Sequence, residues 1–213
     1  MAVTIAPGST SWMLARLARD TREAQATADQ DRLLALDDLT PATYQRFLAI
    51  TYRFEHGVEA GLAGVPDLPV DLAGAVLRCR ILREDLAALA TTRQVADLLA
   101  RPLAPPRFEG AADCLGWLYV VRKNTLEHVS LYRMLAPLLR TTLRMSSRYL
   151  LFQSANVYER WRELGSHLDQ FAHSTEAASR IVAAATAAFV CQHACFVAGC
   201  GVTSGKASSK CGG

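Results

Sequence analysis

Residues 111–137 read AADCLGWLYVVRKNTLEHVSLYRMLAP, and this stretch decides the fold. Its apolar side chains recur at three- and four-residue steps, as in Leu115, Leu118 and Tyr119 and again in Tyr132 and Leu135. Such spacing puts apolar side chains on one face of a helix. The sequence therefore predicts one long amphipathic helix from Ala111 to about Pro137.

The same helical periodicity extends over the rest of the chain, and no run alternates apolar and polar residues as a strand would. Thr40 and Pro41 have the residue types of a helix N-cap and first turn, and Thr91 with Gln94 predicts a capping box. The expected helices cover about residues 10–31, 40–64, 70–90, a short segment after 91, 111–137, 157–171 and 175–196. The fold class is therefore all-α, with a flexible N-terminus at 1–9, one helical domain at 10–198 and a flexible tail rich in Gly, Ser and Cys at 199–213.

Composition supports one globular domain. Of the 213 residues 51% are hydrophobic and 20% charged, so disorder is excluded. The net charge of +3 is spread along the chain, which argues against nucleic-acid binding. No signal-peptide pattern is present, and the apolar stretch 181–205 is interrupted by Gln192 and His193. We expect a cytoplasmic protein that does not enter a membrane, with reduced cysteines.

Five strings, in order over about residues 12–196, resemble heme oxygenases of the bacterial type found with bacteriophytochromes. LARDTREA (17–24) is similar to that family's TRxAH opening, and YQRFLAITYRF (44–54) to its YxxFLxxxYxF run. LREDLAAL (82–89) is similar to LxxDLxxL, and LGWLYVV (115–121) to LGxLYVL. Trp161 stands where the family's penultimate helix carries a Trp. The resemblance implies a helical sandwich that holds heme between its first helix and a kinked distal helix, where heme is oxidised to biliverdin.

The iron-ligand position of that pattern differs here. The proximal histidine of TRxAH falls on Gln25, and none of the five histidines is near it in sequence. An amide oxygen is a weak, neutral donor that cannot replace an imidazole. We therefore expect histidine ligation in the family's manner to be lost.

The distal helix differs as well. The family continues after LYVL with EGSxLGG, whereas this chain has Lys123, Glu127 and His128 at the glycine positions. Replacing three helix-interior glycines stabilises a helix by about 2 kcal/mol in total. We expect a straighter, bulkier distal helix than the reaction needs.

The resemblance also gives a set of candidate cofactor contacts. They are Gln25, Tyr119, Lys123, Asn124, Glu127, His128 and Arg144. Tyr119 equally fits a core aromatic. Arg140, Arg144 and Arg148 form a four-residue-spaced stripe that would bind propionates or remain a solvated face. His128 is the candidate metal ligand, with an ordinary helix histidine as the alternative.

The leading hypothesis is a degenerate heme oxygenase-like protein without normal heme-decyclising turnover. It would bind heme or a linear tetrapyrrole in the old cleft, or serve a partner such as a phytochrome or sensor protein. One alternative is an active heme oxygenase with His128 as a non-standard ligand, and another is a ligand-free helical interaction module. Two metal sites have weaker support: a di-iron site through Glu163 and His167, and a zinc site among the cysteines at 191, 195, 200 and 211.

Overall fold

The computed structural model describes residues 11–65, 77–152 and 154–201, and the described residues contain helices but no strand. The all-α prediction is therefore confirmed. The helices are α1 (Trp12–Asp20), α2 (Arg22–Leu34), α3 (Pro41–Leu62), α5 (Leu77–Ala87), α6 (Arg93–Leu99), α7 (Ala111–Leu126), α8 (His128–Leu135), α9 (Arg140–Ser146), α10 (Arg148–Leu151), α11 (Val157–Phe171) and α12 (Thr175–Gly201), with a 3-10 turn at Ser154–Asn156.

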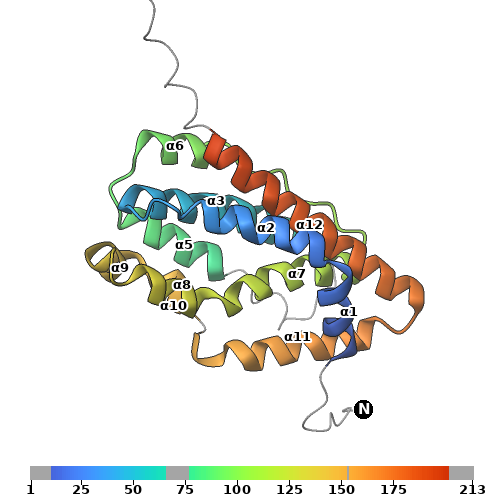
Figure 1. Cartoon of the computed structure of the whole chain (residues 1–213). Helices are drawn as coiled ribbons and strands as arrows, with labels where there is room; N and C mark the ends of the chain where they lie inside the picture. The colour runs from blue at the N-terminus through green and yellow to red at the C-terminus, as the bar shows by residue number, and fades with distance from the viewer. Residues whose placement is uncertain (1–10, 66–76, 153, 202–213) are drawn as a thin grey trace, which may run out of the picture.

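The helices lie in layers around α7 (Figure 1). α12 runs alongside α2 and α3 on one side of α7, and α11 lies on the other side. α1 connects the two layers, because it contacts both α11 and α12. The short helices α8, α9 and α10 form one end of the molecule.

The close contact between α7 and α12 depends on a glycine. A Cβ atom built on Gly116 of α7 would lie 2.5 Å from the Ile181 carbonyl oxygen and 2.6 Å from the Ala184 Cβ of α12. Only a residue without a side chain allows this approach of two backbones. The α7–α12 pair is thus fixed by small residues, and aromatic side chains such as Phe189 fill the space beside it.

The first predicted helix is divided into two. α1 ends at Asp20 and α2 begins at Arg22, with Thr21 between them at φ −103° and ψ 8°. The Thr21 hydroxyl donates to the Leu17 carbonyl oxygen at 2.8 Å, a bond that bends helices. The prediction of one continuous helix over residues 10–31 is therefore wrong, although both halves are helical.

The distal helix is also divided, so the prediction of one straight helix from Ala111 to Pro137 was wrong. α7 ends at Leu126 and α8 begins at His128. The backbone N–H of Glu127 donates to the Asn124 carbonyl oxygen at 3.2 Å, and the Thr125 hydroxyl donates to the Val121 carbonyl oxygen at 3.0 Å. This local bonding breaks the helix without any glycine.

The helix ends agree in part with those predicted from the sequence. Thr40 caps α3 and Pro41 opens it, as predicted. The cap of α6 is Thr92 instead of Thr91, since its side chain accepts from the Val95 backbone N–H. α12 continues to Gly201, so residues 199–201 belong to a helix and not to the predicted tail. The segments 1–9 and 202–213, and the first third of the predicted helix at 70–90, lie outside the described residues.

One helix has the length and composition of a membrane span. The segment Thr175–Cys200 of α12 has a mean hydropathy of 1.8, and 44% of the window is buried inside the protein. Its contacts with α7, α2 and α3 account for this apolar character, because a core helix needs apolar side chains on several faces.

Candidate functional site

Charged side chains join α2 to the end of α7. The Lys123 ammonium lies 3.4 Å from Asp29 Oδ2 of α2 and 3.2 Å from Glu127 Oε1 one turn further along its own helix. The Arg32 guanidinium of α2 pairs with Glu127. The Gln25 amide donates to Asp29 Oδ2 at 3.2 Å. These five residues, which we call the α2–α7 charge network, form a continuous chain of polar contacts between the two helices.

The α2–α7 charge network is largely removed from solvent. Arg32 is only 3% exposed, and the Lys123 and Asp29 side chains are 17% and 21% exposed. Asp29 Oδ1 and Arg32 Nε are buried without a hydrogen-bond partner among the described residues. Breaking a buried pair costs about 3–5 kcal/mol because one charge is left uncompensated, so these contacts resist separation of the two helices.

Asn124 lies beside the charge network but faces another helix. Its side-chain N–H donates to Gln192 Oε1 of α12 at 2.8 Å, and both side chains are buried. Asn124 Oδ1 and Gln192 Nε2 are buried without a partner in the described structure. The pair therefore ties α7 to α12.

His128 is buried at the start of α8. Its ring packs on Tyr149 with the centroids 4.6 Å apart, and its Nδ1 is buried without a partner among the described residues. Burial, together with the positive charges of Arg78 and Arg32, holds the pKa of His128 well below its ordinary value. The imidazole is thus neutral and buried. This environment is closer to that of a core histidine than to that of an open metal ligand.

A second buried polar cluster surrounds His128 on the side of α3 and α5. Arg78 of α5 donates from Nε to Glu55 Oε2 at 3.0 Å and from Nη2 to Glu55 Oε1 at 2.8 Å. It also donates to the hydroxyls of Thr125 at 2.6 Å and Tyr149 at 3.1 Å. Arg78 and the Glu55 side chain are each 2% exposed. This bidentate pair satisfies both charges inside the core, as a structural ion pair requires.

Tyr119 is a core residue. Its ring packs on Trp161 and Phe189 with centroids 5.5 and 6.2 Å apart. Burial raises the pKa of Tyr119 to about 12, and a hydrogen bond with the Thr21 side chain limits the rise. The sequence assignment of Tyr119 as a core aromatic fits this position better than a cofactor contact.

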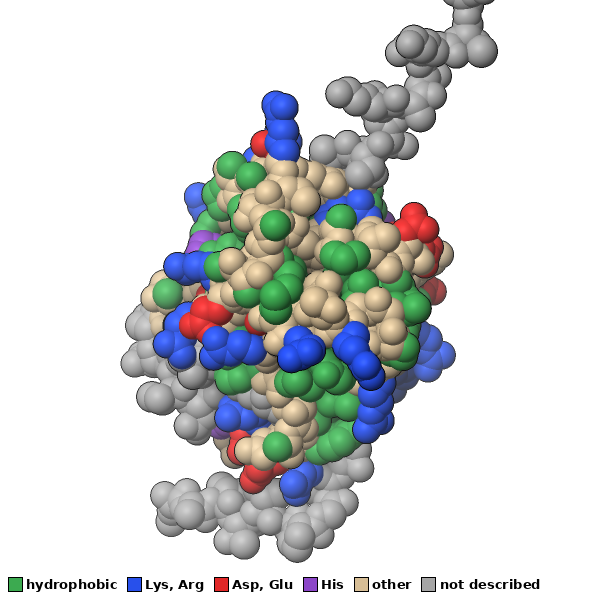
Figure 2. Space-filling model, turned by 90° about the vertical axis from the view of Figure 1, so that its left-hand side faces the viewer, with side chains coloured by type: hydrophobic (Ala, Val, Ile, Leu, Met, Phe, Trp, Pro, Cys, Tyr) green, Lys and Arg blue, Asp and Glu red, His purple; other side chains and the backbone are tan. Residues whose placement is uncertain are grey.

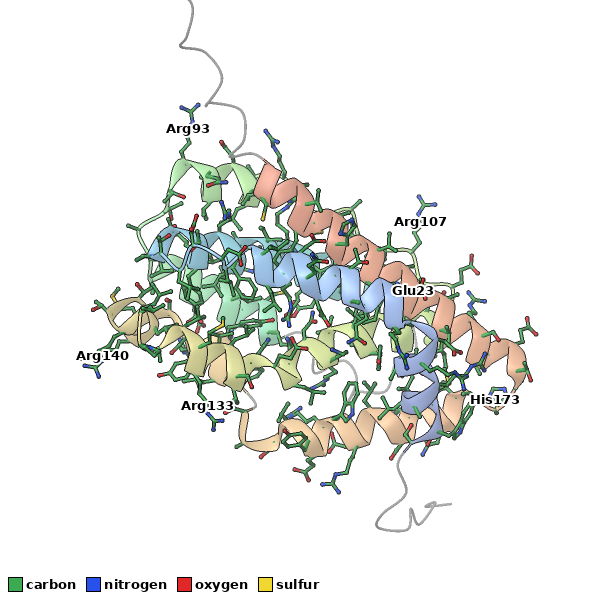
Figure 3. All side chains as sticks on the ribbon, in the orientation of Figure 1. Glu23, Arg93, Arg107, Arg133, Arg140 and His173 are labelled. Atoms are coloured by element: carbon green, nitrogen blue, oxygen red, sulfur yellow. The ribbon has the colours of Figure 1, made fainter. Side chains whose placement is uncertain are left out.

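Arg144 is not part of the α2–α7 charge network. It lies exposed on α9, at the end of the molecule formed by α8, α9 and α10. Arg140 extends away from the protein at the same end (Figure 3). Arg148 pairs with Glu84 at 2.5 Å. The structure therefore separates this basic stripe from the other candidate contacts.

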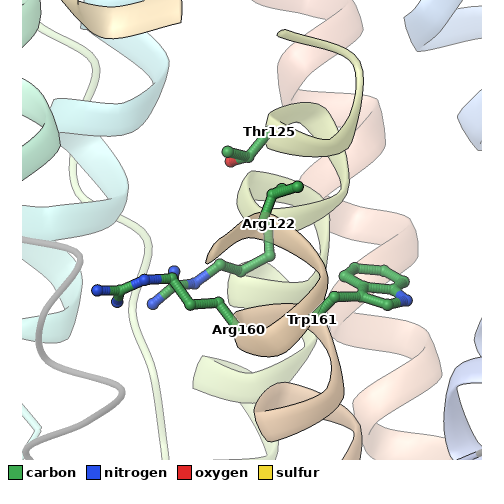
Figure 4. A pocket seen from close by; sticks show the side chains of 5 residues that line it. Arg122, Thr125, Arg160 and Trp161 are labelled. Atoms are coloured by element: carbon green, nitrogen blue, oxygen red, sulfur yellow. The ribbon is translucent and has the colours of Figure 1, made fainter. Parts of the chain in front are cut away.

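The two best-defined hollows are small. One, of about 180 Å³, is lined by Arg122, Thr125, Val157, Arg160 and Trp161, and its two arginines extend to the same side (Figure 4). The other, of about 190 Å³, is lined by Glu55, Val58, Glu59, Arg78, Leu118 and Val121. Pockets for drug-sized ligands usually measure about 300–1,000 Å³, so neither hollow would seat such a molecule.

Sequence reasoning named three of these five residues, as candidate cofactor contacts. It singled out Gln25, Lys123 and Glu127, which the structure brings into one network, but it missed Asp29 and Arg32. Gln25 and Asp29 are four residues apart, as are Lys123 and Glu127, and this spacing places each pair on one helix face. The sequence spacing was therefore a signal that could have indicated Asp29. Among the described residues no group of three or more His, Cys, Asp or Glu side chains is arranged to hold a metal, and Cys211 lies outside them.

Comparison with solved structures shows the fold. The chain superposes on the crystal structure of the NO- and CO-bound heme oxygenase from Neisseria meningitidis with a TM-score of 0.64. The two share 18% sequence identity, and the match covers 93% of this chain and 94% of that one. No protein-family description matches the sequence, and no curated protein does. The heme oxygenase-like fold suggested by the sequence resemblance is thereby confirmed.

Proposed function

We propose that this protein has the heme oxygenase fold without the heme-cleaving reaction, and that it acts by binding another protein. The α2–α7 charge network carries the proposal. The sequence resemblance implies that heme would lie between the helices that carry Gln25 and Lys123. In this chain Lys123 contacts Asp29, and Arg32 contacts Glu127, across the same two helices.

The residues present do not fit a heme held by an axial imidazole. Gln25 offers an amide, and that amide is already hydrogen-bonded to Asp29. A planar cofactor between α2 and α7 would separate Lys123 from Asp29 and Arg32 from Glu127. Arg32 would then lose its carboxylate, at a cost of about 1–3 kcal/mol, less than for a fully buried pair because the Glu127 side chain is 37% exposed.

Two alternatives make different demands on the same residues. An active enzyme that uses His128 needs an imidazole open to iron, whereas this ring is buried and packs on Tyr149. A linear tetrapyrrole needs no iron ligand, but it requires the same separation of α2 from α7. Both are therefore less well supported than a protein-binding role, for which a phytochrome or another sensor protein is the candidate partner.

A turnover assay tests the proposal. Purified protein is mixed with hemin, oxygen and a reductant, and biliverdin formation is followed by absorbance. We expect no biliverdin from the natural chain. Biliverdin formed at a rate that depends on protein concentration, and that is lost in His128→Ala, would establish the active-enzyme alternative instead.

An engineered variant tests whether Gln25 is at the vacated ligand position. Gln25→His combined with Glu127→Gly and His128→Gly restores an imidazole and removes two bulky side chains. We expect this triple variant to gain a histidine-ligated heme spectrum. An unchanged spectrum would contradict the placement of Gln25 next to a former heme cleft. Titration with biliverdin, measured by its absorbance shift, tests the linear-tetrapyrrole alternative separately.

A further inference from the structure

The end of the molecule formed by α8, α9 and α10 has an unusual charge composition. Residues 128–152 contain four arginines, at positions 133, 140, 144 and 148, and no Asp or Glu. Over the whole chain the two signs are nearly balanced, with 23 basic and 20 acidic residues. The segment is therefore a local positive region within an almost neutral protein.

Large apolar side chains are exposed in the same segment. Met134, Leu138, Met145 and Leu151 are 44%, 65%, 52% and 42% exposed. They represent four of the ten large hydrophobic side chains that are exposed in the described residues. Such clustering of apolar groups at a protein surface is typical of a binding site.

The helical spacing places the arginines beside these apolar groups. On α8, Arg133 and Met134 are exposed while Leu131 and Leu135 face the core. On α9, Arg144 and Met145 are exposed while Leu143 faces the core. Each helix thus presents an Arg-Met pair outward, and Leu138 lies in the connection between them. We call Arg133, Met134, Leu138, Arg140, Arg144 and Met145 the α8–α9 surface.

The arginines of the α8–α9 surface are not neutralised by the protein itself. In the described part of the chain no ion pair or hydrogen bond engages the guanidinium groups of Arg133, Arg140 or Arg144. Arg133 and Arg140 extend outward from this end in Figure 3. Figure 2, which faces this end, shows Lys and Arg side chains in a row beside hydrophobic ones, with few acidic groups near them.

We propose that the α8–α9 surface docks a protein partner that presents carboxylates around an apolar centre. The proposal rests on the protein-binding function argued above and names the chemistry of its partner. A negative partner surface would complement the three arginines without an ion pair in the described residues, and an apolar one would complement Met134, Leu138 and Met145. Arginine and methionine are enriched in protein interfaces, whereas lysine is depleted there.

Two other occupants fit the observations less well. A second copy placed by a twofold axis would set this positive surface, which has no Asp or Glu, against the same positive surface, and like charges oppose association. A bilayer surface is usually anchored by Trp or Tyr at the interface, beside Phe and Leu on the apolar face of a basic helix. The exposed apolar side chains of the α8–α9 surface are Met and Leu only.

A defined peptide tests the proposal. The probe is a fluorescein-labelled helical peptide with leucines along one face and glutamates on both sides of them. Binding to the full chain is followed by fluorescence anisotropy at low and at high salt. We expect saturable binding that weakens with salt, because unscreened charge pairs contribute to it.

Matched charge reversals locate the binding site. Arg140→Glu with Arg144→Glu should weaken peptide binding by about tenfold or more, since two attractive contacts become repulsive. The control Arg93→Glu with Arg107→Glu makes the same net-charge change at two exposed arginines elsewhere in the fold (Figure 3), and should leave the affinity within about twofold of the natural chain. Leu138→Ser with Met145→Ser tests the apolar part and should weaken binding while preserving the salt dependence.

Each result has a distinct meaning. Equal loss of affinity in both double charge reversals would overturn the α8–α9 surface as the docking site, and so would the absence of saturable binding. Tighter binding to phosphatidylglycerol vesicles than to the peptide would assign the surface to a membrane instead.

Heme turnover is measured on the same protein. Biliverdin production contradicts the proposed function, whereas missing peptide binding without turnover contradicts the docking surface alone. Circular dichroism confirms that every variant is folded.

Discussion

α7 contacts its neighbours in two contrasting ways. Against α12 it packs mainly through small and apolar residues, with Gly116 against the Ile181 backbone and one buried hydrogen bond from Asn124 to Gln192. Against α2 it makes ion pairs through Lys123 and Glu127, and Asp29 Oδ1 and Arg32 Nε have no hydrogen-bond partner in the described part of the chain. The first contact is one that the fold itself requires. The second occupies the space that the family resemblance assigns to a cofactor.

Under the proposed function, the difference is one between a fold that is kept and a site that has changed. Apolar packing at α7–α12 depends on shape, so few residues can be altered there without loss of stability. The ion pairs at α2–α7 hold two helices together at the place where the proposed function locates the former cofactor site. The core and the site are therefore under separate physical constraints in this protein.

Gly116→Ala tests the tighter contact and should have the largest effect. The new methyl group would lie within 2.5–2.7 Å of two backbone atoms and one side chain of α12. Overpacking of this kind costs about 1–3 kcal/mol or more, and backbone atoms move least easily. The measurement is urea unfolding followed by circular dichroism.

Gly64→Ala is the matched control, because its new methyl group would meet only the Gly61 carbonyl oxygen at 3.5 Å. It should change the free energy of unfolding much less than Gly116→Ala. Equal effects of the two substitutions would show that the α7–α12 contact is looser than described.

Glu127→Gln tests the charged contact. It leaves the buried Arg32 without its carboxylate and removes one of the two partners of Lys123. We expect the free energy of unfolding to fall by about 1–3 kcal/mol, less than for a wholly buried pair because the Glu127 side chain is 37% exposed.

Asp20→Asn supplies the comparison for Glu127→Gln, since it breaks the exposed contacts of Asp20 with Arg16 and Arg19. Surface pairs contribute little, so its effect should be the smaller one. The account of the α2–α7 contact would be wrong if Glu127→Gln were as stable as the natural chain in urea.

His128→Asn tests the burial of His128 through the pH dependence of the free energy of unfolding. The folded pKa of His128 is lowered, so the unfolded chain takes up a proton first as the pH falls below the ordinary histidine value of about 6.5. The natural chain should therefore lose stability on acidification, by at most about 1.4 kcal/mol for each pH unit. The variant should lack this contribution.

The readout is the difference in unfolding free energy between natural chain and variant from pH 7 to pH 5. The difference between the two proteins is used because a second group titrates in this range: burial raises the pKa of Glu59 to about 7. Protonation of Glu59 stabilises the folded state as the pH falls, whereas protonation of His128 in the unfolded chain destabilises it. The exposed His173 provides a control as His173→Asn. Parallel pH profiles for the natural chain and His128→Asn would contradict a buried neutral imidazole.

The sequence predicted the helical class and the family of folds, because periodicity and ordered strings report on the core. It could not predict the helix break at Glu127, since the residues that replace the glycines favour a continuous helix. It could pair Gln25 with Asp29 within one helix but could not show that Lys123 would reach Asp29 from another. Contacts between distant segments depend on how helices cross, and single-sequence patterns do not specify that.

Hemin titration of the natural chain tests the central claim most directly. The claim is that the α2–α7 charge network excludes a histidine-ligated heme. The account predicts weak, non-saturating absorbance changes in the Soret region up to and beyond one equivalent. A sharp Soret band that saturates at one equivalent, with the electron paramagnetic resonance spectrum of an axial histidine, would contradict it.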